Sequence, residues 1–115
     1  MNTPEIKKAT VQNIARIIEY VPKSVVIRDI IRKATGSISI IAFDAGEELH
    51  KKICPFDIFI EIIEGSAEVV IDDKSTLLKT GQAIIIPAHA ANGIIACELC
   101  KMLVTTIKSG YEGDL

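Results

Sequence analysis

The chain of 115 residues is 49% hydrophobic, and its 13 Lys and Arg against 15 Asp and Glu give a formal net charge of −2. This balance gives no support for nucleic-acid binding, which depends on a basic face, and the hydrophobic content argues against an intrinsically disordered chain. The short basic pairs Lys7–Lys8, Arg32–Lys33 and Lys51–Lys52 are expected to be solvated surface. The length suits a single domain over residues 1–115.

The sequence carries no membrane or secretion signal. No apolar run reaches the roughly 18 residues that a membrane-spanning helix needs. The N-terminal residues lack the apolar core of a signal peptide, and three cysteines, an odd number, suit reduced thiols. We therefore expect a cytoplasmic protein that does not contact membranes.

The first predicted element is a short helix over about residues 11–19. Val11, Ile14 and Ile18 recur there at helical spacing, and Pro22 follows as a helix-ending residue. We expect this helix to pack on the outside of the domain.

From Ser24 onward the pattern predicts strands, because β-branched and alternating segments are separated by Gly, Asp and Pro. Strands that recur every 8–12 residues or so are typical of an antiparallel sandwich or barrel. We expect an all-β barrel over about residues 24–108 and a tail over residues 109–115. The expected strands cover residues 24–33, 37–43, 54–65, 66–72, 76–81, 82–87, 92–98 and 99–108.

The strand expected over residues 54–65 is apolar on both faces. Every second residue from Ile58 faces one side, whereas Phe59 and Ile63 face the other. The outer face of a monomeric barrel is mostly polar, so these two side chains indicate a cover, either a second subunit or the N-terminal helix. Two-fold dimers are the commonest oligomers, and we expect a homodimer.

Two blocks of the sequence begin or end on glycines. They are "FDAGEELHKKICPFDIFIEIIEG" at residues 43–65 and "GQAIIIPAHAAN" at residues 81–92. This arrangement resembles the cupin superfamily, in particular its small single-domain members, whose motifs are G-x5-H-x-H-x3,4-E-x6-G and G-x5-P-x-G-x2-H-x3-N. The resemblance implies an RmlC-like jelly-roll barrel, also called a double-stranded β-helix.

The resemblance holds for the frame of the motifs but not for their metal ligands. Gly46 and Gly65 match the ends of the first motif, and Gly81 and Pro87 match the second. The four ligand positions fall on other residue types. They are Lys52, Cys54, Ile58 and Asn92.

Three of these four replacements are poor metal ligands. A lysine must lose its proton to bind, an isoleucine has no donor atom, and an amide oxygen is a weak ligand. We therefore expect a degenerate metal site and no cofactor.

Polar side chains nevertheless converge at the expected mouth of the barrel. Lys52, Cys54 and Asn92 are placed there by the resemblance, and His50 and His89 are expected at the rim. A cationic and polar rim on an apolar pocket suits a small molecule such as an organic acid. We expect a binding or accessory module rather than an enzyme, and we assign no catalytic residue.

Two alternative functions remain open. His50, Cys54 and His89 are a ligand set that zinc or another divalent metal would accept, which would suit a metal-dependent oxygenase or isomerase. The other alternative is a structural dimer without a ligand. For His89 alone, the alternative to a binding role is an exposed loop residue.

Cys97 and Cys100 form a C-x-x-C pair between two expected strands. Redox pairs of this kind sit at a helix N-terminus, where the helix dipole lowers the thiol pKa. No helix is expected here, so we expect Cys100 to be a core thiol, with a redox or metal-binding pair as the alternative.

Overall fold

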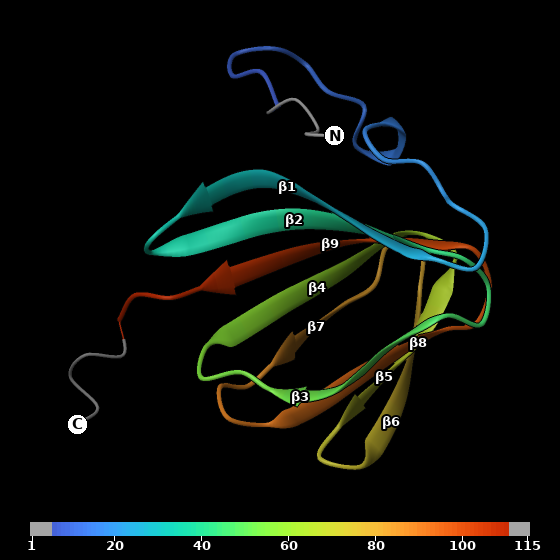
Figure 1. Cartoon of the computed structure of the whole chain (residues 1–115). Coiled ribbons are helices and arrows are strands. Elements are labelled where there is room, and N and C mark those ends of the chain that lie inside the picture. The colour runs from blue at the N-terminus through green and yellow to red at the C-terminus, as the bar shows by residue number, and fades with distance from the viewer. Residues whose placement is uncertain (1–5, 111–115) are drawn as a thin grey trace.

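The computed structural model describes residues 6–110, which form an almost entirely β structure (Figure 1). Within these residues, no helix is long and apolar enough to cross a membrane. The elements in chain order are the 3₁₀ turn η1 (Ile14–Arg16) and the strands β1 (Val25–Lys33), β2 (Gly36–Phe43), β3 (Glu48–Ile53), β4 (Asp57–Glu64), β5 (Ser66–Ile71), β6 (Lys74–Lys79), β7 (Ala83–Ile86), β8 (Ala91–Ala96) and β9 (Cys100–Ile107).

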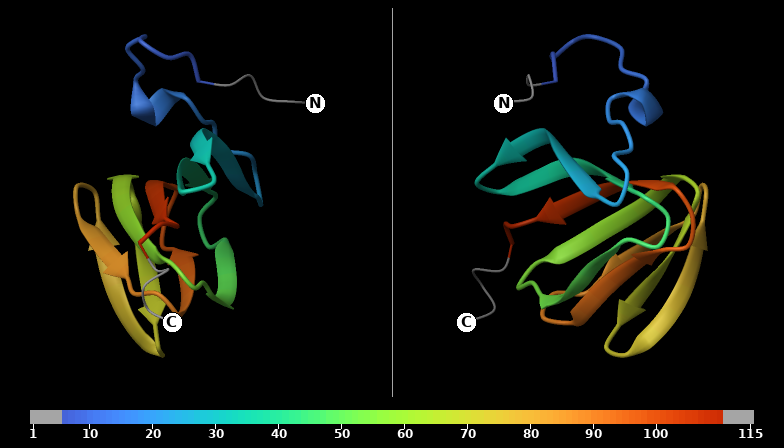
Figure 2. Two further views of the ribbon diagram at one scale, coloured as in Figure 1. Left: turned by 90° about the vertical axis from the view of Figure 1, so that its left-hand side faces the viewer. Right: turned by 45° about the vertical axis from the view of Figure 1, so that its right-hand side comes forward.

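The strands form two antiparallel sheets that face each other (Figures 1 and 2). The five-stranded sheet has the order β1-β2-β9-β4-β7, and the four-stranded sheet has the order β3-β8-β5-β6. Apart from the consecutive pairs β1–β2 and β5–β6, neighbouring strands come from distant parts of the chain, as in jelly rolls. This architecture confirms the predicted all-β barrel.

The core lies between the two sheets and follows from strict alternation along the strands. On β4, Ile58, Ile60 and Ile62 are buried, whereas Phe59 between them is 38% exposed. Phe43 and other large apolar side chains from both sheets complete a single cluster. Because successive strand residues point to opposite faces, this pattern fixes which side of the sheet is the interior.

The predicted helix over residues 11–19 was wrong. Only Ile14–Arg16 forms a turn, and Asn13 makes no side-chain capping hydrogen bond to it. The segment is rich in β-branched residues, which disfavour short isolated helices. Ile18 is buried against Ile40 and Ala42 on the outer face of the five-stranded sheet, but Val11 is 98% exposed.

A cluster of polar side chains fastens the N-terminal segment to the outer face of the five-stranded sheet. The Tyr20 hydroxyl donates to the Glu64 carboxylate at 2.5 Å, and the buried Lys101 amine donates to the Ala15 carbonyl oxygen at 2.5 Å. The same amine lies 4.8 Å from the centre of the Tyr20 ring and 3.9 Å from the Glu64 carboxylate. Burial, and then the hydrogen bond to Glu64, raises the pKa of Tyr20 well above its usual value, so this hydroxyl remains a donor.

The predicted strands omit residues 48–53, where the structure has β3. The pairing register of β3 with β8 shifts between Leu49 and Lys52, so the two residues His50 and Lys51 lie opposite the single residue Gly93. Such a bulge breaks the alternation that a strand prediction relies on. A side chain at position 93 would contact the bulged backbone, since an added Cβ would lie 3.4 Å from the Leu49 carbonyl oxygen.

Candidate functional site

Lys52 and Asn92 meet at the end of the β3–β8 pair. They are cross-strand partners, and the Asn92 Nδ2 donates to the Lys52 carbonyl oxygen at 3.4 Å. Asn92 is only 2% exposed, whereas Lys52 is exposed. The side-chain amide of Asn92 is therefore used in a hydrogen bond to the backbone, whereas the amine of Lys52 faces solvent at the rim of the barrel.

Cys54 and His89 are joined through the backbone. The His89 N–H donates to the Cys54 carbonyl oxygen at 2.7 Å, which ties the loop after Pro87 to the segment after β3. Cys54 is half-buried against the core, and His89 is exposed. His89 has a φ of 71°, a left-handed conformation that glycine adopts freely and that histidine tolerates better than most residues. His89 occupies the position of the second glycine of the second motif, and this positive φ explains why a glycine suits that position.

His50 does not point into the barrel mouth as expected. Its side chain is 89% exposed, and its Nδ1 lies 3.2 Å from the Glu48 carboxylate. Glu48 and His50 are two residues apart on β3 and share the outer face. The bulge that follows then returns Lys52 to the inner face, on which Asn92 lies. Extrapolating alternation across an unseen bulge produced the wrong orientation.

The side chains that could bind a metal ion do not come together in this structure. Among residues 6–110, no group of three or more His, Cys, Asp or Glu side chains could hold a metal ion. His50, Cys54 and His89 therefore do not form a zinc site in this arrangement. At the family ligand positions, Ile58 is part of the core and the Asn92 amide is bonded to backbone, so these residues do not fit the metal that cupins bind.

The two cysteines of the C-x-x-C pair have different environments. Cys97 is exposed on the turn between β8 and β9, whereas Cys100 is fully buried in the core. Burial raises the pKa of Cys100 to about 12, and the nearby charges of Cys97, Glu98 and Glu64 add to the shift. The Cys100 thiol therefore stays protonated and inert at neutral pH, as expected for a core thiol.

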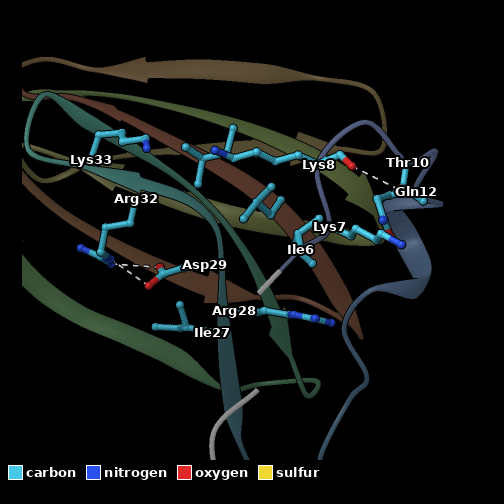
Figure 3. A pocket seen from close by; sticks show the side chains of 12 residues that line it. Ile6, Lys7, Lys8, Thr10, Gln12, Ile27, Arg28, Asp29, Arg32 and Lys33 are labelled. Carbon is cyan, nitrogen blue, oxygen red and sulfur yellow. Dashed lines mark hydrogen bonds and ion pairs between the residues drawn. The ribbon is translucent and has the colours of Figure 1, made fainter. Parts of the chain in front are cut away.

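A cavity of about 810 Å³ lies away from the barrel mouth, between the N-terminal segment and β1 (Figure 3). We call it the β1 cleft. Five of its lining residues are basic, four are isoleucines, and Asp29 is the acid among them. The lining residues are Ile6, Lys7, Lys8, Thr10, Gln12, Ile27, Arg28, Asp29, Ile30, Ile31, Arg32 and Lys33.

Sequence reasoning missed the β1 cleft. Its basic pairs, Lys7–Lys8 and Arg32–Lys33, were expected to be ordinary solvated surface. The pairs are about two dozen positions apart, and only the return of the N-terminal segment along β1 brings them to one cavity. No local sequence pattern indicates that the N-terminal segment runs back along β1.

Two facing antiparallel sheets with this strand order, carrying the two glycine-anchored blocks, define a small cupin barrel. No protein-family model matches the sequence, and no curated protein matches it either. Solved structures do match the fold.

Three of these structures cover nearly the whole chain. A conserved protein of unknown function from Streptococcus pyogenes is 24% identical, with a TM-score of 0.87 over 93% of this chain and 94% of that chain. A cupin superfamily protein from Desulfitobacterium hafniense DCB-2 is 22% identical, with a TM-score of 0.84 over 93% and 98%. An RmlC-like cupin protein from Desulfovibrio desulfuricans is 22% identical, with a TM-score of 0.77 over 86% and 96%. The chain therefore has the fold of a small RmlC-like cupin domain.

Proposed function

We propose that this chain is a binding or accessory cupin domain that uses no metal at the family position, and that it binds a small organic anion at the barrel rim. The observation that carries the proposal is the pairing of Lys52 with Asn92 on β3 and β8. Within the described part of the chain, no carboxylate forms an ion pair with the Lys52 amine, so its charge is available to a ligand.

The neighbours of Lys52 support an anionic ligand. The exposed imidazole of His89 lies on the loop tied to Cys54, and an imidazole donates hydrogen bonds to a carboxylate. The half-buried Cys54 side chain packs on the apolar core and supplies a non-polar contact. A cation with a directional donor over an apolar surface is a common way to hold a carboxylate.

Substituting Lys52 with methionine is expected to weaken binding of small carboxylates by at least tenfold or so, because it removes the charge and keeps the aliphatic stem. Binding of benzoate and succinate would be followed by NMR chemical-shift titration of the free protein. Lys51→Met is the matched control, since Lys51 is committed to Asp73 at 2.9 Å. Equal affinities for the wild type and Lys52→Met would contradict the proposal. Stoichiometric zinc, iron, manganese or nickel after purification without chelators would instead favour a metal-dependent oxygenase or isomerase.

The outer face of the five-stranded sheet supports a second candidate, a homodimer. One cross-strand row runs over all five strands as Ile31, Ile38, Thr105, Phe59 and Ile85. Ile85 is 61% exposed and Ile31 is 47% exposed. A row with exposed apolar side chains at Ile31, Phe59 and Ile85 favours burial against another surface.

The charges beside this row favour a second copy as the cover. Lys33 lies on the outer face at the β1 side, and Asp57 and Glu61 lie on the outer face of β4. A two-fold axis near the central strand β9 would place the basic side of one copy over the acidic side of the other. A two-fold interface is self-complementary in this way.

Ile85→Asp is expected to shift the dimer dissociation constant by about 30-fold or more, the effect of losing roughly 2 kcal/mol at an interface hot spot. Sedimentation velocity over a range of concentrations would measure it. The matched control is Ile53→Asp, at a 69% exposed position on β3 of the other sheet. A wild-type protein that stays monomeric at roughly 100 μM would rule out a stable homodimer, since standard interfaces associate well below that concentration.

A further inference from the structure

β1 forms an edge of the five-stranded sheet. In the described residues it pairs with β2 on one side, and the strand order ends there on the other (Figure 1). An edge strand offers a row of backbone N–H and C=O groups to another extended chain. The N-terminal segment passes along this side of the sheet in each view (Figures 1 and 2).

The β1 cleft runs along this edge rather than over one face of the sheet. Its lining includes every residue from 27 to 33 without a gap. Side chains alternate between the faces of a strand, so a cavity on one face would contact mainly every second residue. The opposite wall is formed by residues of the N-terminal segment between Ile6 and Gln12. The cleft is therefore a slot with a strand edge as one side.

The charge of the slot is positive although the whole chain is slightly acidic. The single lining acid, Asp29, already accepts hydrogen bonds from Arg32 at 2.8 and 2.9 Å and from Ser39 at 2.9 Å. Figure 3 shows the Lys8 side chain reaching from the N-terminal segment toward the end of β1 that carries Lys33. These two amines give the slot an excess of positive charge over a floor of isoleucines.

A second copy of β1 in parallel register does not suit this edge. Parallel, in-register pairing of β1 with itself would place Arg32 and Lys33 opposite the same basic residues of the other copy. Like charges on adjacent strands destabilise the pairing, and basic residues on an edge strand are a common defence against self-association. An acidic strand would instead be attracted to these basic residues.

We propose that an extended acidic segment of another protein adds as a strand to β1, on the side away from β2 and next to the N-terminal segment. Backbone hydrogen bonds to β1 give affinity in this mode of recognition, and alternate side chains give specificity. Carboxylates of the segment meet Lys8 and Lys33, and the apolar side chains on its other face contact Ile27, which is 57% exposed. This site shares no residue with the Lys52 rim.

A fluorescein-labelled nine-residue peptide of alternating glutamate and valine tests the proposal by fluorescence anisotropy with the full chain. We expect it to bind, and the double variant Lys8→Glu/Lys33→Glu to weaken binding at least tenfold or so, since each charge reversal replaces an attraction by a repulsion. The matched control is Lys74→Glu/Lys79→Glu, with two exposed lysines on β6, an edge strand of the other sheet. This control is expected to change binding little.

Two further measurements separate strand addition from simple charge attraction. The same peptide with N-methyl groups on alternate residues keeps its charge but cannot form a backbone ladder, so it is expected to lose binding. Hydrogen exchange of the amides in residues 27–33 is expected to slow when the unmodified peptide binds.

Several results would overturn the proposal. The first is that the peptide does not bind. The second is that the N-methylated peptide, or a peptide of alternating lysine and valine, binds as tightly as the glutamate–valine peptide. The third is that the Lys8→Glu/Lys33→Glu variant keeps full affinity with an unchanged melting temperature. Protection of β1 that rises with protein concentration alone would assign the edge to a second copy. The same protection produced by benzoate would assign the cleft to a small anion.

Discussion

Replacing Gly65 with alanine is expected to destabilise the barrel by about 4 kcal/mol or more, enough to leave much of the protein unfolded. Gly65 has a φ of 83°, and an added Cβ would lie 2.0 Å from the Leu99 carbonyl oxygen and 3.0 Å from the Cys100 Cα. Both neighbours are backbone atoms, so relief of the clash requires the turn into β9 to move. Urea denaturation followed by circular dichroism measures the loss.

Gly81→Ala separates the clash from the backbone conformation. Gly81 has a φ of 85°, nearly that of Gly65, but an added Cβ would meet nothing within 4 Å. We expect only the conformational cost of a left-handed alanine, about 1–2 kcal/mol. Equal losses for the two variants would show that the close approach to Leu99 is not what requires glycine at position 65.

Ile60→Ala is expected to cost about 2–5 kcal/mol of unfolding free energy, because the lost side chain leaves a cavity that packed neighbours fill only in part. Ile60 is 1% exposed and lies between Val104 on β9 and Ile84 on β7. It therefore lies on the inner face of the five-stranded sheet, on a strand that is paired on both sides. Thermal and urea unfolding of the purified variant would measure the change.

Ile53→Ala makes the same chemical change at a 69% exposed position on β3. There the methyl groups contact mainly water, and we expect a change within about 0.5 kcal/mol. A loss at Ile53 as large as that at Ile60 would mean that the Ile53 side chain is packed in the protein and not exposed on β3.

Much of the fold could be predicted because the turns, and the alternation of apolar and polar residues along strands, depend on residues that are close together in the sequence. Asp72 and Asp73 both have positive φ and join Ile71 to Lys74 in a two-residue hairpin, and Asp tolerates that conformation better than most residues. On β4, the apolar residues at every second position indicated the buried face correctly. Local chemistry of this kind does not depend on which strands become neighbours.

The errors arose where tertiary context overrides the local pattern. Residues 11–19 have helical spacing, but Ile18 is held by Ile40 and Ala42 of the sheet rather than by a helix. His50 was expected to face inward because alternation was counted through the bulge in β3. A bulge inserts one residue and reverses the count, and nothing in the local composition marks its position.

Of the two candidate sites, one could be predicted from the sequence and the other could not. The juxtaposition of Lys52 with Asn92 was expected, since the motif frame fixes the spacing between strands. The β1 cleft was not, because its two walls meet only when Tyr20 and Lys101 fasten the N-terminal segment to the sheet. Contacts between side chains this far apart in the chain leave no periodic trace in the sequence.

The position of β9 also governs when the barrel can assemble. Among the strands of residues 6–110, β9 comes last, yet it lies in the middle of the five-stranded sheet, between β2 and β4. On the ribosome, a nascent chain that has not yet released Cys100–Ile107 holds β2 and β4 with open edges and no strand to bridge them. Pairings between distant segments form slowly, and open edges attract other chains. The five-stranded sheet therefore forms only after β9 has left the ribosome, and until then the open edges of β2 and β4 can pair with other chains.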